Sequence, residues 1–305
     1  MASSDRIVAV IGPTAAGKSN VSIALAKGLG NAEIVNVDSM QVYRGMDIGT
    51  AKLPFSERRG VPHHLLDILD VTEPATVAQF QVWARAAIAD CRHRRVVPII
   101  VGGSALYIRA VLDKFEFPGT DPDIRTRWET DLAARGSEAL HALLASRDPA
   151  AATEILPTNG RRIVRALEVI DLTGKPYAST LPAHEYAFGD VTQIGLDVPR
   201  DVLDERIRIR VDRMWGAGLV DEVRALSKLG LVEGRTARRA LGYAQVLDFL
   251  DGKCSEDEAH QATVNKTRKF ARRQDRWFRQ DPRIHWLRYD ADDLLDRAVA
   301  LVHRS

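Results

Sequence analysis

A complete phosphate-binding loop near the start of the chain constrains the fold more than any other feature of the sequence. The run at residues 6–11 is mostly apolar and rich in β-branched side chains, which is typical of a strand buried in a parallel sheet. Directly after it, and before apolar residues at helical spacing, comes the P-loop pattern formed by Gly12, Pro13, Thr14, Ala15, Ala16, Gly17, Lys18 and Ser19. This order of strand, loop and helix predicts an α/β fold that binds a phosphate.

The residue types in the loop explain how it would hold an anion. Glycines let backbone N–H groups turn inward, the helix N-terminus contributes its dipole, and Lys18 adds a positive charge. The hydroxyl of Ser19 is a ligand for Mg²⁺, which we expect as the cofactor. The pattern does not distinguish a diphosphate ester from a triphosphate. The alternative is a glycine-rich turn that caps an ordinary helix.

Strands and helices alternate along the first part of the chain. Strands are predicted at 33–37 and 96–101, and the capping pair Thr76 and Gln79 opens a helix between them. A further helix is predicted from about Ala105. Alternation with short connections implies a parallel sheet with helices on both faces. The predicted fold class is therefore α/β, a P-loop NTPase-like parallel sheet flanked by helices.

A strand-poor segment interrupts this alternation. Helices joined by turns with proline and glycine are predicted at 124–135, 137–144 and 161–172, and strand character returns at 192–198. Later segments predict a helix at 200–229 with a break near Gly216–Gly218, a long helix opened by Ser255 and Glu258, a strand at 284–289 and a terminal helix. The predicted organisation is a P-loop core in two parts, 1–114 and 200–305, with a mostly helical insertion domain at 115–199.

Composition excludes several classes of protein. Of the 305 residues, 45% are hydrophobic and 28% charged, and 43 basic against 41 acidic residues leave a net charge of +2, as in an ordinary globular protein. The two cysteines, Cys91 and Cys254, form no metal-binding pattern, and His63-His64 lacks a third ligand nearby in the sequence. Apolar runs are too short for a membrane span or a secretion signal. We expect a cytoplasmic protein and, without a heptad seam, a monomer.

Polar residues follow the predicted strands at the edge where parallel sheets place their sites. Asp38 follows the second strand and Ser104 the third, although Asp38 could also cap a turn and Ser104 a helix. Another candidate is the helical stripe of Arg206, Arg210 and Arg213. It either keeps the helix soluble or holds the far side of a diphosphate.

Basic residues gather in a few segments although the net charge is small. Residues 265–280 read NKTRKFARRQDRWFRQ and carry Arg272, Arg276 and Arg279 at helical spacing, with Trp277 between them. Basic side chains with aromatic neighbours on one helix are typical of RNA binding, and a solvated basic face is the alternative. Smaller basic groups are Arg161, Arg162 and Arg165, and Arg235, Arg238 and Arg239. Separate groups fit an extended polyanion better than a small metabolite.

Several motifs together resemble the tRNA dimethylallyltransferase family. In chain order they are GPTAAGKS at 12–19, DSMQVY at 38–43, MDIGTAK at 46–52, VGGS at 101–104, RALE at 165–168, LGY at 241–243 and RRQDRWFR at 272–279. The resemblance spans nearly the whole chain, and the combination is far more specific than the P-loop by itself.

The resemblance implies an activity. The family transfers a dimethylallyl group from dimethylallyl diphosphate to N6 of the tRNA adenosine 3′-adjacent to the anticodon, tRNA position 37. The product is N6-(dimethylallyl)adenosine, and diphosphate is released. The implied partners are the anticodon stem-loop of tRNA and dimethylallyl diphosphate, and the P-loop of the family is often described as an ATP site. Ser19 and Ser104 stand where the family usually has threonine, and both keep the hydroxyl.

The resemblance also implies roles for individual residues. Residues 12–19 would cradle the donor diphosphate, Asp38 would activate the acceptor, and Ser19 and Arg210 would complete the catalytic set. The residues expected to contact tRNA are Asp38, Ser39, Met40, Gln41, Ser104, Arg125, Arg161, Arg162, Ile163, Val164, Arg165, Arg239, Ala240, Leu241, Gly242, Tyr243, Ala244, Arg272, Arg273, Gln274, Asp275, Arg276, Trp277, Phe278 and Arg279.

Two other function classes remain open from the sequence. A P-loop small-molecule kinase would begin with the same strand, loop and helix, but it would transfer phosphate from ATP without RNA. An RNA-binding regulator with a degenerate P-loop would hold RNA without turnover, although the intact Lys18 and Ser19 argue against lost chemistry.

Overall fold

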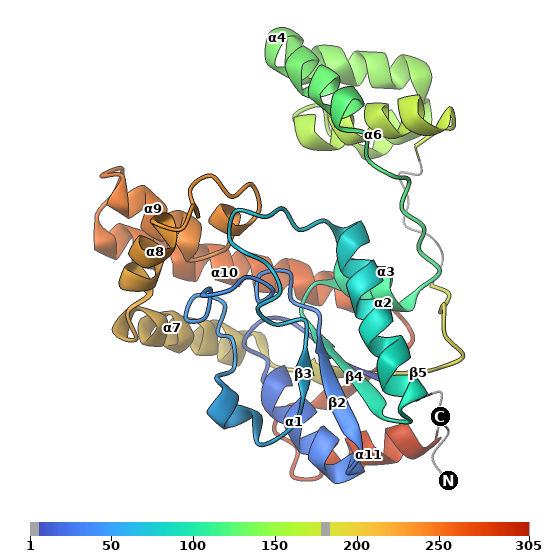
Figure 1. Ribbon diagram of the computed structural model, residues 1–305, viewed down its shortest axis with the longest axis vertical. Helices are drawn as coiled ribbons and strands as arrows, with labels where there is room; N and C mark the ends of the chain where they lie inside the picture. Colours follow the sequence, from blue (N-terminus) through green and yellow to red (C-terminus); the bar gives the residue numbers. More distant parts are fainter. Residues whose placement is uncertain (1–5, 178–183, 305) are drawn as a thin grey trace. The chain divides into compact units, whose positions relative to one another are not determined.

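The computed structural model describes residues 6–177 and 184–304 and divides the chain into two compact units. The first unit joins Met1–Asp113 to Tyr186–Ser305, and the second is the segment Lys114–Glu185 (Figure 1). The insertion predicted from the sequence is therefore present, but it ends at Glu185 and not at residue 199. The reason is that the strand β5 (Asp190–Asp197), which lay inside the predicted insertion, pairs with the first strand of the core.

One parallel sheet organises the first unit. Within the described residues it has six strands in the order β3-β2-β4-β1-β5-β6, and every neighbouring pair is parallel. The strands are β1 (Arg6–Ile11), β2 (Ala32–Asn36), β3 (His63–His64), β4 (Val97–Gly102), β5 and β6 (Ile284–Arg288). The predicted α/β class is confirmed. The sequence did not predict β3, because a two-residue strand is too short to show a period.

Helices cover both faces of the sheet, and the first strand shows why. Alternate β1 residues point to opposite faces, so Ile7 and Ile11 pack with α2 (Val77–His93) and α3 (Ala105–Leu112). Val8 and Val10 pack on the other face with α1 (Lys18–Leu29) and α11 (Leu294–Arg304). All of β1 is therefore buried, as a central parallel strand requires.

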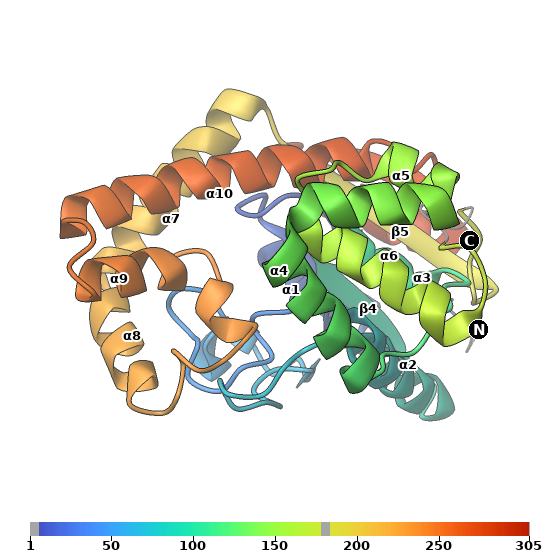
Figure 2. The same cartoon turned by 90° about the horizontal axis from the view of Figure 1, so that it is seen from above.

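The remaining helices of this unit follow their local sequence signals. These helices are α7 (Arg200–Gly216), α8 (Leu219–Ser227), α9 (Tyr243–Leu250) and α10 (Glu256–Phe278). The predicted break falls at Gly218, whose φ of 95° starts α8. Ser255 and Glu258 form the predicted reciprocal capping box of α10. The helix α10 packs along both α7 and α9 (Figure 2).

The second unit is a helical domain with its own core. Its helices are α4 (Pro122–Arg147), α5 (Pro149–Glu154) and α6 (Gly160–Thr173). Two helices were predicted where α4 runs, at 124–135 and 137–144, and the break between them is confirmed at Gly136, whose φ of 78° is not helical. Leu140 and Leu167 belong to the buried cluster that holds the unit together. Among the described residues, no helix of either unit combines the length and the apolar character needed to cross a bilayer.

Candidate active site

The P-loop lies at the carboxyl end of β1 and opens α1. Gly12 and Gly17 adopt φ angles of 144° and 101°, a region that side chains disfavour, so glycine is required for this path of the backbone. Lys18 folds back over the loop, and its Nζ donates a hydrogen bond of 2.8 Å to the Pro13 carbonyl. Ser19 is exposed in the first turn of α1. A helix N-terminus together with a lysine suits this loop to an anion.

An arginine from a remote helix completes the positive side of the site. Arg210 of α7 donates to the Thr14 hydroxyl at 2.9 Å, so it is the member of the predicted stripe that contacts the loop side chains. Burial, followed by the charge of Arg210, lowers the pKa of Lys18 to about 8, while Asp38 acts in the opposite direction. Burial also lowers the pKa of Arg210, and Asp38 again opposes the shift. Two crowded cations favour a bound anion.

Asp38 follows β2, at the same end of the parallel sheet as the P-loop, and shapes its own loop. Its Oδ1 accepts a hydrogen bond from the Met40 N–H at 2.8 Å, so the turn-capping role considered from the sequence is real. The charge of Asp38 also raises the pKa of both Lys18 and Arg210, against the larger effect of burial, so its carboxylate acts electrostatically on the cations of the P-loop. Burial raises the pKa of Tyr107, and the side chain of the next loop residue, Ser39, opposes this shift. Sequence reasoning missed Tyr107, because nothing local marks a helical tyrosine as a neighbour of this loop.

Gln274 of α10 joins the P-loop to the loop after β4. Its Oε1 accepts from the Thr14 N–H at 2.9 Å, and its Nε2 donates to the Gly103 carbonyl at 2.7 Å. A Cβ on Gly103 would lie 2.7 Å from that nitrogen, so a larger residue there would displace the Gln274 amide. Gln274 was predicted to contact tRNA, but its buried amide holds the two loops together. Ser104 is the N-cap of α3, and its hydroxyl makes no capping hydrogen bond to the described residues of that helix.

The predicted RNA-binding helix α10 has two faces. Arg272, Arg273 and Arg276 are exposed, and Trp277 is 42% exposed, whereas Phe278 is buried in the main core. The remaining residues of the motif make contacts within the protein. Arg279 pairs with Asp197 and Asp275 and stacks over Trp286.

The segment 239–244 is mostly internal. Arg239 is exposed, whereas Ala240 and Tyr243 are buried and Gly242 begins α9. The Tyr243 hydroxyl donates to Glu222 at 2.5 Å. Side-chain contact between Tyr243 and tRNA is therefore excluded by burial. The neighbouring Leu241 and Ala244 are half-buried.

The basic residues of the second unit also divide into two groups. Arg125 and Arg165 both pair with Glu168, which is fully buried, so these guanidinium groups stabilise the unit itself. Arg161 and Arg162 are exposed at the start of α6. The predicted contact residues Ile163 and Val164 are buried in the helical core, because they lie on the inner face of α6.

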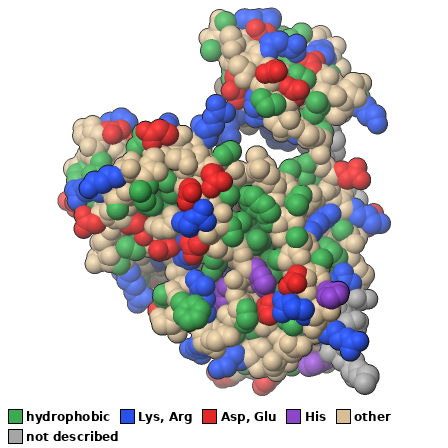
Figure 3. Space-filling model, in the orientation of Figure 1, with side chains coloured by type: hydrophobic (Ala, Val, Ile, Leu, Met, Phe, Trp, Pro, Cys, Tyr) green, Lys and Arg blue, Asp and Glu red, His purple; other side chains and the backbone are tan. Residues whose placement is uncertain are grey.

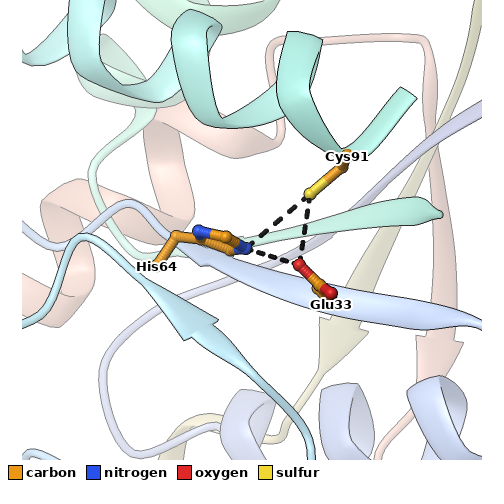
Figure 4. Close-up of side chains that lie close together, drawn as sticks. All are labelled: Glu33, His64 and Cys91. Atoms are coloured by element: carbon orange, nitrogen blue, oxygen red, sulfur yellow. Dashed lines mark hydrogen bonds and ion pairs between the residues drawn. The ribbon is translucent and has the colours of Figure 1, made fainter. Parts of the chain in front are cut away.

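A second polar cluster lies at the β3 edge of the sheet. Glu33, His64 and Cys91 come together there, so the fold supplies the neighbours that His63-His64 lacks in the sequence (Figure 4). Hydrogen bonds from Arg94 lead the effects that lower the pKa of Glu33 to about 2, and burial raises the pKa of Cys91 to about 12. A protonated thiol is a poor metal ligand, and Arg94 already pairs with the carboxylate. The cluster is therefore an ion-paired network.

Charge on the visible surface is mixed. Basic and acidic side chains are interspersed on the face drawn in Figure 3, in keeping with 43 basic and 41 acidic residues. The described part of this face therefore has no large patch of a single sign. The exposed side of α10 carries Arg272, Arg273 and Arg276 within five residues of sequence.

Comparison with known proteins identifies the family. A family model described as IPP transferase matches residues 41–281. The chain is 63% identical over 300 residues to the tRNA dimethylallyltransferase of Thermobifida fusca, which covers 97% of this chain and 94% of that protein. The chain belongs to the IPP transferase family. An identity of 61% over 298 residues to the tRNA dimethylallyltransferase of Kineococcus radiotolerans, covering 96% and 94%, agrees.

Solved structures of IPP transferases show the same fold. The full-length tRNA isopentenylpyrophosphate transferase of Bacillus halodurans is similar with a TM-score of 0.71 and 39% identity, covering 98% of this chain and 97% of that one. A eukaryotic dimethylallyltransferase acting on tRNA has a TM-score of 0.83 and 27% identity, covering 97% and 77%. The resemblance inferred from the motifs is confirmed. The family model begins at residue 41, so its match does not include the P-loop or Asp38. The roles of these residues are argued from the geometry described above.

Proposed function

We propose that this protein transfers a dimethylallyl group from dimethylallyl diphosphate to N6 of adenosine 37 of tRNA and releases diphosphate. One observation carries the proposal: in an IPP transferase chain, the P-loop, Arg210 and Asp38 meet at one end of the sheet. This arrangement offers cations for a leaving diphosphate and a carboxylate for an acceptor that must lose a proton. Both groups are needed for an alkyl transfer to an amine.

The P-loop side suits the donor. Negative charge grows on the diphosphate as its bond to the allylic carbon breaks, and Lys18, Arg210 and the backbone N–H groups of 12–19 would stabilise that charge. Ser19 presents an exposed hydroxyl oxygen beside Lys18, which fits the hard oxygen ligands that Mg²⁺ prefers. When bound there, Mg²⁺ would supply further positive charge to the diphosphate.

The Asp38 side suits the acceptor. The N6 lone pair of adenine is delocalised into the ring, so a base that accepts the N6 proton makes the nitrogen a better nucleophile. Asp38 would take this proton, and residues Asp38–Gln41 with Ser104 would hold the base. The adenosine must leave the anticodon-loop stack to reach a carboxylate at the end of a sheet strand. The exposed Arg272, Arg276 and Trp277 of α10 would bind the RNA backbone and stack on bases.

The alternatives find less support. The matched family is described as a transferase and the relatives' names refer to tRNA, which favours neither a small-molecule kinase nor a regulator without turnover. A kinase would transfer phosphate from ATP in the absence of RNA. We further propose that the protein is cytoplasmic and monomeric. Light scattering of the purified chain would test whether it is a monomer.

Mass spectrometry of tRNA nucleosides tests the activity directly. The protein is incubated with unmodified tRNA, Mg²⁺ and dimethylallyl diphosphate, and the anticodon-loop nucleosides are then analysed. We expect a dimethylallyl mass gain on one adenosine, and none with tRNA whose position 37 is guanosine. No gain on either tRNA, together with phosphate release from ATP, would favour the kinase.

A further inference from the structure

The segment 46–52 is anchored from outside by a single carboxylate. Glu222 of α8 accepts hydrogen bonds from three successive backbone N–H groups. Its Oε2 lies 3.1 Å from the nitrogen of Asp47 and 2.8 Å from that of Ile48, and its Oε1 lies 3.3 Å from the nitrogen of Gly49. Three N–H groups around one carboxylate fix the path of the backbone far more tightly than one surface ion pair.

Tyr243 completes this anchor from the other side. Its hydroxyl donates to Oε1 of Glu222 at 2.5 Å, and its ring is fully buried. Burial and the charge of Glu222 raise the pKa of Tyr243 far above its usual value, so the phenol stays protonated and keeps donating. A Cβ on Gly49 would lie 2.4 Å from the Tyr243 ring. The segment therefore lies directly against the tyrosine, and this contact requires glycine at position 49.

The anchored segment supports the loop that follows β2. Gln41 donates through Nε2 to the Thr50 carbonyl at 3.0 Å. The Thr50 hydroxyl donates to the Met46 carbonyl at 2.6 Å, and the Lys52 ammonium donates to the Tyr43 carbonyl at 2.8 Å. Loop 38–43 and segment 46–52 thus form one hydrogen-bonded body. A displacement of the backbone at 47–49 would therefore reach Gln41 through its hydrogen bond to Thr50.

We propose that Glu222, supported by Tyr243, is a positioning residue that sets loop 38–43 against the acceptor adenosine. The inference rests on the proposed function, in which Asp38–Gln41 hold that base. It gives a role to the motif MDIGTAK, which lines up three amides for one carboxylate. A neutral side chain of the same size cannot serve these donors equally, because the amide of glutamine offers one acceptor oxygen in place of two.

Variants of the two anchor residues test the proposal. Glu222→Gln keeps the size of the side chain, and Tyr243→Phe removes only the hydroxyl, so the second variant serves if the first folds poorly. Asp221→Asn is the matched control, because Asp221 lies on the same helix, carries the same charge and pairs on the surface with Arg224. Hydrogen exchange at the amides of 47–49 reports on the anchor without requiring any activity.

The kinetic measurement separates acceptor from donor. For Glu222→Gln we expect exchange at 47–49 to be faster by about tenfold or more. We also expect kcat/KM for an anticodon stem-loop to fall about 10- to 100-fold, because a misplaced reactive group slows reaction. The affinity for inorganic diphosphate with Mg²⁺ should be unchanged. Tyr243→Phe should show the same pattern more weakly, and Asp221→Asn should show none of it.

Three results would overturn the proposal. Unchanged hydrogen exchange at 47–49 would show that Glu222 does not anchor this segment. Faster exchange with unchanged kcat/KM for the stem-loop removes the positioning role, as does an equal loss of diphosphate affinity, which indicates a general structural defect. If the wild-type protein makes no prenylated product, the proposed function fails and the positioning role fails with it, whereas the exchange data still decide whether the anchor exists.

Discussion

The proposed donor and acceptor sides of the site depend on distant residues to different degrees. The proposed donor side is one continuous run, residues 12–19, which supplies a helix N-terminus and Lys18, and Arg210 and Gln274 contact it through Thr14. The proposed acceptor side is a short loop after β2 whose neighbouring segment is held by Glu222 of α8. A diphosphate is a simple anion, so a local motif with few additions from elsewhere suits it. A base needs an oriented surface, which must be assembled from several elements.

The largest effect is expected on the acceptor side, at Asp38. Asp38→Ala should lower the rate of transfer about 10²- to 10⁴-fold, the usual share of a general base, and should leave diphosphate affinity nearly unchanged. Single-turnover kinetics with saturating tRNA measure this rate. Asp38→Asn keeps an oxygen that can accept the Met40 N–H and so preserves the turn. An Asn variant as active as wild type would assign Asp38 to the turn only.

A substitution on the donor side should lower the affinity for diphosphate as well as the rate. Lys18→Met removes the charge that faces the diphosphate and should cost about 10²- to 10³-fold in kcat, as loss of one preorganised stabilising group does. Diphosphate affinity measured by calorimetry should fall as well. Lys27→Met, an exposed change on the same helix, is the control. Equal activity of the two variants would contradict a charge-stabilising role for Lys18.

The exposed face of α10 should affect affinity for tRNA and leave the chemistry intact. Arg276→Glu should weaken tRNA binding at every sequence tested and lower the slope of log affinity against log salt by about one or more. Filter binding over a range of salt concentrations measures both. Arg297→Glu makes the same charge change on α11, and its tRNA affinity should stay at the wild-type value. Unchanged affinity and slope for Arg276→Glu would reduce this face to a solvated surface.

The smallest effect is a pH dependence confined to the donor side. Lys18 has a pKa of about 8 in the free protein, so it is charged below that pH and loses its proton above it. Affinity for dimethylallyl diphosphate should therefore hold up to about pH 8 and then fall by up to about tenfold per pH unit. Titration calorimetry from pH 6.5 to about 9.5 follows this change. The fall should be absent in Lys18→Met, and a fall that persists there would assign it to another group.

Much of the fold was accessible from local pattern. Apolar runs predicted five of the strands, and capping residues such as Thr76 and Ser255 predicted where helices begin, because these signals act within one turn of a helix or one strand. The end of the insertion was misplaced because whether β5 belongs to the sheet or to the insertion depends on its partner strand. Strand pairing is a contact between residues far apart in sequence, and no local signal marks it.

The sequence by itself determined the P-loop pattern, the family and the run of basic residues in α10, since short continuous motifs carry each of them. Only the tertiary structure decided which members of the other motifs face a ligand. It buries Tyr243 against Glu222, gives Gln274 the task of joining two loops, and pairs Arg125 with Glu168. A basic or polar residue reads the same in a sequence whether it binds substrate or a buried carboxylate. The partner that satisfies its hydrogen bonds is supplied by the fold.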